Sequence, residues 1–283
     1  MTDRRWKRQA QACLLPLIAM LLLFLAMPLV IMLRQSFADE NGNGFSLTNF
    51  IQIITQPFYY DAFTNSLLIS FYSAVVGLLL AMAVTAALVT LSRQAQDRLT
   101  LFINMTANFA GVPLAFAYII LIGNAGVVTL LLGKVGIPLQ NFFNLYSWQG
   151  LAVTYVYFQV PLGVLFLYPV YKNLNPAWRE AATLLGAGRL SFWMRVGLPH
   201  ILPSVVGTFI ILFANGMGTY ETAYALVGSN ISLVTTRIAS LVSGDIFAKP
   251  QLGSAMAVLF GLLMLLVLAI NELVLRLFRR DLE

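Results

Sequence analysis

Six stretches of predominantly apolar residues, each about as long as a membrane-spanning helix, constrain this chain more than any other feature. They occupy residues 13–33, 66–91, 99–122, 150–171, 202–220 and 252–275. A helix needs about 20 apolar residues to cross a hydrocarbon core of about 30 Å, because each residue adds about 1.5 Å of rise. The sequence therefore predicts an all-α membrane protein with six transmembrane helices.

The composition agrees with a membrane protein and excludes several other classes. Of the 283 residues, 59% are hydrophobic and 10% are charged, whereas soluble domains carry about 25% charged residues. A soluble enzyme, a nucleic-acid-binding domain and a disordered chain are excluded on this ground. Because the chain has one cysteine, Cys13, and one histidine, His200, we expect no intramolecular disulfide and no metal site.

The distribution of basic residues predicts how the chain is oriented in the membrane. If the N-terminus is cytoplasmic, only four of the 17 Lys and Arg residues fall outside, namely Arg34, Lys134, Arg237 and Lys249. Basic residues concentrate in the loops that stay inside, so both termini are expected in the cytoplasm. The first apolar stretch is too long for the core of a signal peptide and no small-residue cleavage site follows it, so we expect it to remain as a span.

The longest predicted cytoplasmic segment, residues 172–201, has the pattern of two short helices rather than a loop. Asn175 is a suitable N-cap for the first helix, and Gly186 is a typical stop signal. Ser191 is expected to cap a second helix over residues 192–196, which would end before the next proline. From spacing alone, this segment fits a pair of interfacial helices as well as it fits a docking surface for another protein.

The order of residues in this segment resembles the EAA loop of the permease subunits of type I ABC importers. The family pattern is Glu-Ala-Ala, three residues, Gly, nine residues and Ile-x-Leu-Pro. This chain has Glu180-Ala181-Ala182, then Gly186, then Val196-Gly197-Leu198-Pro199, with valine in place of isoleucine. The resemblance implies a permease core over residues 61–272. Residues 1–60 would supply the cytoplasmic N-terminus, the first span and an outer surface segment, and residues 273–283 a cytoplasmic C-terminus.

In that family the EAA loop is a coupling helix that docks on an ATP-binding subunit. The resemblance therefore implies that this chain docks an ATPase through Glu180, Ala181, Ala182, Gly186, Leu198 and Pro199. It also implies two copies of the ATP-binding subunit, a second permease subunit, an extracytoplasmic substrate-binding protein, and a place in the inner membrane of a prokaryote. The sequence has no phosphate-binding loop motif, so we expect no enzymatic activity and no cofactor on this chain, with ATP and magnesium on the partners.

Polar residues within or at the ends of spans are candidates for a substrate path, because burying them in a bilayer is costly. The candidates are Asn108, Gln159, Asn215, Tyr220 and Glu221. Interhelical hydrogen bonds explain the Asn and Gln residues nearly as well, and Glu221 is equally well an ordinary carboxylate at the outer interface. Glu272 is four residues before Arg276, which favours an ion pair within one helix over a functional site.

The hypothesis that follows is the permease subunit of an ATP-driven importer. Glu221 and several tyrosines suit a small polar or cationic solute such as a polyamine, while the branches that import phosphonate, iron or sulfate stay open. The alternative outside the family is an autonomous ion-coupled secondary transporter. That class often has an inverted repeat and carboxylates near the bilayer midplane, and neither is apparent in the sequence.

Overall fold

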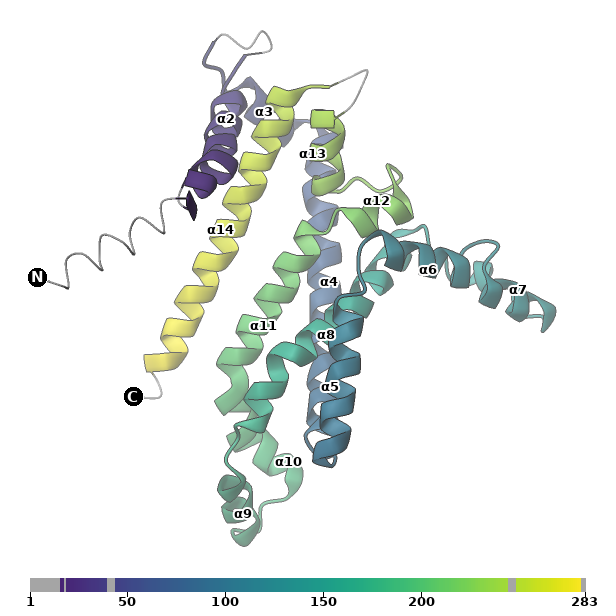
Figure 1. The fold of residues 1–283 in the computed structure, drawn as a ribbon, viewed down its shortest axis with the longest axis vertical. Helices are drawn as coiled ribbons and strands as arrows, with labels where there is room; N and C mark the ends of the chain where they lie inside the picture. The colour runs from purple at the N-terminus through teal and green to yellow at the C-terminus, as the bar shows by residue number, and fades with distance from the viewer. Residues whose placement is uncertain (1–15, 18, 40–43, 244–247, 281–283) are drawn as a thin grey trace, which may run out of the picture. The chain divides into compact units, whose positions relative to one another are not determined.

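The computed structural model describes residues 16, 17, 19–39, 44–243 and 248–280, and these residues are nearly all helical (Figure 1). The described part contains six helical segments long and apolar enough to cross a membrane: Ala19–Ser36, Pro57–Leu88, Val112–Lys134, Trp148–Lys172, Leu190–Gly218 and Pro250–Leu273. Their number agrees with the prediction. Cys13 and the start of the first predicted span lie outside the described residues.

The helices follow one another along the chain with short connections. In order they are η1 (Leu22–Ala26), α2 (Met27–Ser36), α3 (Thr48–Thr55), α4 (Pro57–Leu88), α5 (Arg93–Ala107), α6 (Val112–Ile122), α7 (Val127–Lys134), η2 (Leu139–Asn141), α8 (Trp148–Lys172), α9 (Pro176–Leu184), α10 (Arg189–Phe192), η3 (Trp193–Gly197), α11 (Leu198–Gly218), α12 (Glu221–Val227), α13 (Val234–Ser243) and α14 (Pro250–Arg280).

The third predicted span, residues 99–122, is not one helix, and this part of the prediction was wrong. Helix α5 ends at Ala107, and α6 begins at Val112 after a non-helical stretch. Gly111 has φ 74° and ψ −149°, a backbone conformation that is essentially restricted to glycine. Pro113 follows in the first turn of α6, where its missing N–H costs no hydrogen bond. In Figure 1, α6 and α7 run crosswise to α5.

Contacts within the chain divide it into two compact units. One comprises the residues up to Tyr60 together with Arg237–Leu263, and the other comprises Asp61–Thr236 together with Met264–Glu283. In the first unit, the Asn49 side chain donates hydrogen bonds to the carbonyl oxygens of Ser36, at 3.3 Å, and Ala38, at 2.9 Å. These bonds fix the start of α3 beside the end of α2. The predicted division into residues 1–60, 61–272 and 273–283 stays a prediction.

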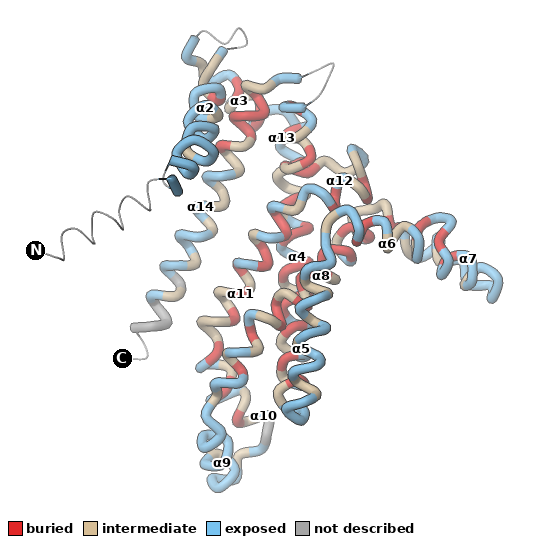
Figure 2. Tube along the Cα trace, viewed as in Figure 1, coloured by how far each residue is buried: buried red, intermediate tan, exposed pale blue. Residues whose placement is uncertain are grey.

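Helix α8 is the central element of the second unit. Helices α5 and α11 pack on α8, and α12 packs on α6. A Cβ atom added to Gly163 of α8 would lie 2.8 Å from Ala81 Cβ of α4 and 3.4 Å from Leu212 Cδ1 of α11. The glycine therefore lets three helices approach one another closely. Buried positions follow α4, α8 and α11 in Figure 2, whereas every residue of α9 except the half-buried Ala182 is exposed.

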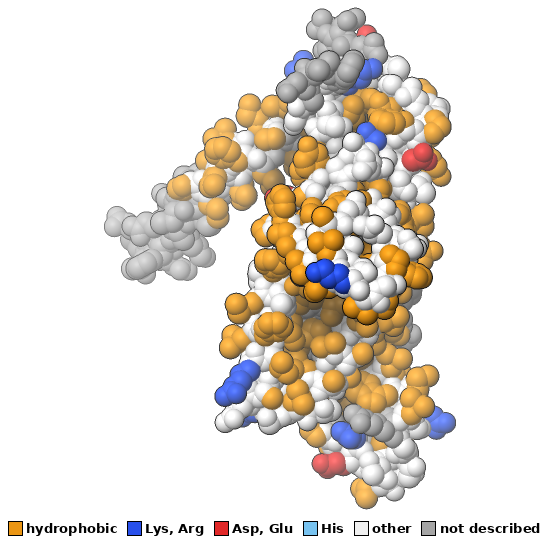
Figure 3. All heavy atoms as spheres, turned by 90° about the vertical axis from the view of Figure 1, so that its right-hand side faces the viewer, with side chains coloured by type: hydrophobic (Ala, Val, Ile, Leu, Met, Phe, Trp, Pro, Cys, Tyr) orange, Lys and Arg blue, Asp and Glu red, His pale blue; other side chains and the backbone are white. Residues whose placement is uncertain are grey.

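Much of the apolar surface outside this core is exposed in the isolated chain. Hydrophobic side chains cover much of the face drawn in Figure 3, and charged side chains are few on it. Leu79, Phe102 and Leu265, for example, are all more than half exposed. A soluble domain does not tolerate so large an apolar surface, while a bilayer solvates it.

Candidate functional site

Helix α9, which carries Glu180, Ala181 and Ala182, is capped at both ends by its own residues. At the N-terminus, Asn175 Oδ1 accepts a hydrogen bond of 3.0 Å from the Ala177 N–H. At the C-terminus, Gly186 has φ 76°, and its N–H bonds the Thr183 carbonyl while the Ala187 N–H bonds the Ala182 carbonyl. This pair of bonds is the Schellman motif. The predicted cap at Asn175 and stop at Gly186 are confirmed.

The second predicted helix, residues 192–196, differs from the structure in both its ends. Helix α10 begins at Arg189, and Ser191 lies inside it, because the Phe192 N–H bonds the carbonyl of Gly188. The chain then passes through the π-helix η3 directly into α11, without a stop before Pro199.

The π-helical turn has a local cause. Pro199 has no N–H, and its ring would collide with the carbonyl oxygen four residues earlier in a regular α-helix. The wider turn, in which the Leu198 N–H bonds the Trp193 carbonyl, accommodates the proline. The fifth apolar helix therefore extends from Leu190 to Gly218 instead of starting at residue 202.

Two aromatic contacts connect α9 and η3 to the long helices. The Trp193 ring lies 5.4 Å from the Tyr171 ring at the end of α8, and the Trp178 ring of α9 lies 4.7 Å from the His200 ring at the start of α11, in an edge-to-face arrangement. Aromatic pairs of this geometry contribute about 0.5–1.5 kcal/mol each beyond area burial. His200 thus packs on Trp178, a contact between separate helices that the sequence alone does not reveal.

Gly197 is needed for the position of Trp193. A Cβ atom added to Gly197 would lie 2.6 Å from Trp193 Cε3, and the indole covers the glycine so closely that Gly197 is buried. A glycine one turn after a tryptophan is the sequence signal that could have indicated this packing.

Replacing Gly197 with alanine is expected to displace the Trp193 ring from Tyr171 and to destabilise the chain by about 1–3 kcal/mol, the usual cost of overpacking. Thermal unfolding of the purified full chain measures the loss, and tryptophan fluorescence reports the displacement. Gly207→Ala is the control within the same long helix, because a Cβ at Gly207 meets nothing within 4 Å. Equal stability of the two variants would contradict the packing role of Gly197.

The predicted docking residues lie in two places. Glu180 and Ala181 are exposed and Ala182 is half-buried on α9, with Gly186 in its C-terminal cap, while Leu198 is half-buried and Pro199 exposed at the start of α11. Leu184 and Leu185, at the tip of α9, are 89% and 86% exposed. The exposed face of α9 therefore combines small residues, one carboxylate and an apolar tip.

Of the predicted substrate-path residues, Gln159 lies deepest. It is fully buried in α8, and its Nε2 donates to Ser73 Oγ of α4 at 3.1 Å and to the Leu212 carbonyl of α11 at 3.5 Å. Glycines lie on both sides of it, since a Cβ at Gly77 or Gly216 would come within 3.0 Å of its side chain. Gln159 therefore makes the interhelical hydrogen bonds that are the alternative to a place in the substrate path.

Glu221 lies at the break between α5 and α6. It is the first residue of α12, and its Oε2 is 2.6 Å from where a Cβ of Gly111 would stand. Gly111 is the N-cap position of α6, so the carboxylate lies beside the positive N-terminal end of that helix. A negative charge at this place stabilises a helix.

The other candidates make local contacts. Asn108, in the same break, is exposed and donates a 2.8 Å hydrogen bond to the Asn104 carbonyl. The Tyr220 ring lies 5.5 Å from that of Tyr224, and Asn215 is exposed on α11. The structure thus places Asn108 and Glu221 at the α5–α6 break, with Tyr220 next to Glu221 in the chain, and Gln159 elsewhere. Whether any of them contacts a solute stays a prediction.

One simpler expectation has a direct structural counterpart. The Glu272–Arg276 ion pair is confirmed, with Oε1 and Nε 2.9 Å apart and both side chains more than half exposed. Among the described residues, no group of three or more His, Cys, Asp or Glu side chains is placed to hold a metal ion.

Comparison with known proteins finds relatives of one kind, although no family model matches the chain. It is 23% identical over 260 residues to a ferric transport system permease protein, FbpB 1, of Haemophilus influenzae, and 31% identical over 137 residues to the sulfate transport system permease protein CysT of Salmonella typhimurium. It is 26% identical over 196 residues to a 2-aminoethylphosphonate transport system permease protein, PhnU, of Salmonella typhi.

The chain and these relatives overlap to different extents. The matches cover 90%, 48% and 69% of this chain, in the same order, and 40%, 49% and 67% of the relatives. The chain therefore spans less than half the length of the ferric and sulfate permeases that it matches.

Solved structures share the fold at low sequence identity. A bacterial ABC transporter that imports the acidic polysaccharide alginate has a chain with a TM-score of 0.77 and 18% identity, covering 97% of this chain and 99% of that one. The MetNI methionine ABC transporter, in an inward-facing conformation, gives a TM-score of 0.60 and 18% identity over 79% of this chain and 99% of that one. The arrangement of helices is therefore that of transmembrane subunits of ABC importers.

Proposed function

We propose that this chain, whose homologues are ABC transporter permeases, is the membrane-spanning permease subunit of an ATP-driven importer. The observation that carries the proposal is α9: an exposed helix, capped at both ends, with Glu180, Ala181 and Ala182 on it and Gly186 in its C-cap. A fold shared with importer subunits supports it as well.

The connections of α9 suit the transmission of force. At one end, Asn173–Asn175 link α9 to α8, and at the other end α10, η3 and α11 follow with no more than a short turn between α9 and α10. The Tyr171–Trp193 pair joins α8 to η3, and the Trp178–His200 pair joins α9 to α11. Because packed helices move as rigid bodies, a displacement of α9 by an ATP-binding subunit would move α8 and α11 together.

The proposed complex contains the partners that this role requires. Two ATP-binding subunits would dock on α9 of this chain and of a second permease subunit, and they would bind the ATP and magnesium. A bacterial alginate transporter with a similar fold has been solved in complex with a ligand-bound periplasmic protein, which supports an extracytoplasmic binding protein here. The proposed location is the inner membrane of a prokaryote, with both termini cytoplasmic.

A polyamine is no longer the substrate that we propose. The relatives named above transport ferric iron, sulfate or 2-aminoethylphosphonate by their names, and they lend no support to a polyamine. The position of Glu221 weakens the physical argument too, because its carboxylate is placed at the N-terminus of α6. We propose that the transported solute is one of these three kinds.

The test is to purify the tagged full chain in a mild detergent and to identify by mass spectrometry every protein that stays bound to it. We expect a stoichiometric ATP-binding protein, and ATP-dependent uptake of iron, sulfate or phosphonate after reconstitution in liposomes with a binding protein. A chain that purifies without an ATPase and transports solute under an ion gradient alone would overturn the proposal in favour of a secondary transporter.

A further inference from the structure

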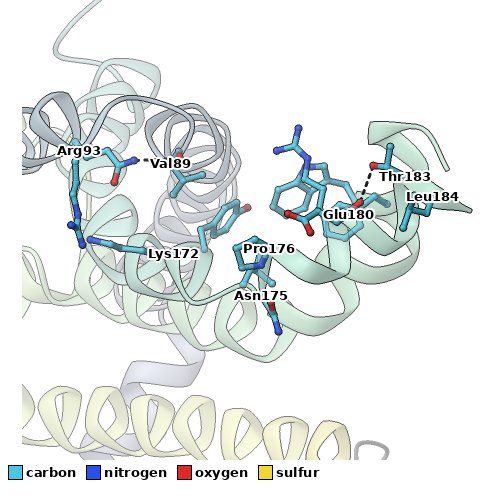
Figure 4. Close-up of a pocket in the computed structure, with 14 residues that line it drawn as sticks. Val89, Arg93, Lys172, Asn175, Pro176, Glu180, Thr183 and Leu184 are labelled. Atoms are coloured by element: carbon cyan, nitrogen blue, oxygen red, sulfur yellow. Dashed lines mark hydrogen bonds between the residues drawn. The ribbon is translucent and has the colours of Figure 1, made fainter. Parts of the chain in front are cut away.

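A cavity of about 950 Å³ opens beside α9 in the second unit (Figure 4). Five helical elements line it, namely the first turn of α5, the last turn of α8, α9, α10 and η3, together with Val89 just after α4. Its polar lining comprises Arg93, Gln96, Tyr171, Lys172, Asn175, Arg179, Glu180 and Thr183. Arg93, Gln96 and Lys172 are outside the residues that we assign to docking or to a substrate path.

The charges that line this cavity are unequal. Arg93, Lys172 and Arg179 face one carboxylate, that of Glu180. In the described part of the chain, none of these three cations lies within 4 Å of an acidic group. Figure 4 shows the Arg93 and Lys172 side chains pointing toward each other. Both side chains are exposed, so water screens their repulsion, and an anion placed between them would be attracted to both.

The N-terminus of α5 adds to the positive potential. Helix α5 has 15 residues and begins at Arg93, its first turn contains no acidic residue, and the Ser92 side chain makes no capping hydrogen bond. Its first N–H groups therefore lack a partner from a cap, and an arginine at this end opposes the helix dipole. An anion bound here would satisfy these donors and compensate the charge of Arg93.

The rest of the lining indicates what kind of anion fits. Val89, Leu174, Leu184, Phe192 and Trp193 give the cavity a large apolar wall. The volume is near the upper end of the range of small-molecule sites and far exceeds that of a bare inorganic ion. A phosphate group that carries an organic substituent matches both the cationic and the apolar part.

We propose that this cavity binds a phosphate-bearing ligand, with the phosphate between Arg93, Lys172 and the N-terminus of α5 and its organic part against the apolar wall. The phosphate belongs to a membrane lipid headgroup or to a free phosphorylated solute. The site shares Glu180 and Leu184 with the exposed face of α9, whereas Arg93 and Lys172 lie outside that face, and it does not depend on the function proposed above.

The test uses the purified, delipidated full chain in dodecyl maltoside, a detergent that carries no phosphate. Native mass spectrometry measures the binding of two probes, phosphatidylglycerol and glycerol 3-phosphate. We expect one tightly bound phosphate ligand, and a binding constant weakened about tenfold in Arg93→Gln and in Lys172→Gln, since each loses one charge-assisted hydrogen bond. Arg93→Lys keeps the charge and is expected to restore most of the binding.

The matched control is Arg98→Gln, which removes an exposed arginine from α5 that does not line the cavity. Binding of phosphatidylglycerol alone identifies the ligand as a lipid, and binding of glycerol 3-phosphate identifies a free solute. Unchanged binding in both cavity variants, or an equal loss in Arg98→Gln, would overturn the proposal. So would a result in which Arg93→Gln leaves phosphate binding intact but weakens association with an ATP-binding subunit, because the cavity would then be a protein-docking site.

Discussion

Exchanging Glu180 for lysine is expected to abolish most ATP-driven uptake while leaving the chain folded and inserted. Glu180 is exposed on α9 and has no part in the apolar core, so the exchange should change stability little. In the proposed complex, its carboxylate would meet the ATP-binding subunit, where like-charge juxtaposition costs several kcal/mol. A loss of about 2 kcal/mol already weakens docking about thirtyfold. Uptake and ATP hydrolysis in proteoliposomes, with co-purification of the ATPase, measure the effect.

The matched control for this exchange is Glu272→Lys. It makes the same change of charge at an exposed carboxylate of α14 whose ion pair with Arg276 lies on the surface, and it is expected to cost a few tenths of a kcal/mol. Glu180→Gln separates loss of the charge from its reversal and should give an intermediate rate. If Glu180→Lys takes up solute at the wild-type rate, Glu180 makes no contact with an ATPase and α9 is an interfacial helix.

The features of residues 172–201 that follow from local rules could be predicted from the sequence. Asn175 before a proline, and a glycine after an apolar helical run, determine the ends of α9 through hydrogen bonds with residues two to five positions away. No knowledge of the tertiary structure is needed for these. The number of spans follows similarly, since it depends only on the length and apolarity of each stretch.

The features that the sequence did not predict depend on neighbours that are distant in the chain. Residues 99–122 are apolar enough on average to look like one span, although Asn108 lies close to Gly111, and only the backbone angles show that the helix ends. The burial of Gln159 against Ser73 and Leu212 joins three helices. Glu221 begins α12, just after α11, and Gly111 lies between α5 and α6, so their contact brings together two helix ends that are far apart in the chain. A polar residue in a span is therefore ambiguous until its neighbours are known.

Replacing Gly111 with alanine is expected to be the most destabilising of these substitutions, because two costs add. The first is backbone strain, about 1–3 kcal/mol for a non-glycine residue at φ 74° and ψ −149°. The second arises because the new Cβ would lie 2.6 Å from Glu221 Oε2 and must displace the carboxylate from the N-terminus of α6, which costs about 0.3–1 kcal/mol. We expect a total of about 3 kcal/mol, measured by chemical unfolding of the purified full chain.

A double-mutant cycle separates the two costs. Glu221→Ala removes the carboxylate, so it should relieve the second cost of Gly111→Ala and leave the first, giving a coupling energy of about 0.5–1 kcal/mol. Gly136→Ala is the matched control, since Gly136 also has a positive φ, 83°, but a Cβ there meets nothing within 4 Å; it should lose stability with no coupling to Glu221. A coupling energy of zero at Gly111 would mean that the carboxylate contributes nothing at the α6 terminus. Glu221 would then be free to face a transported solute, and Glu221→Gln would be expected to lower uptake without lowering stability.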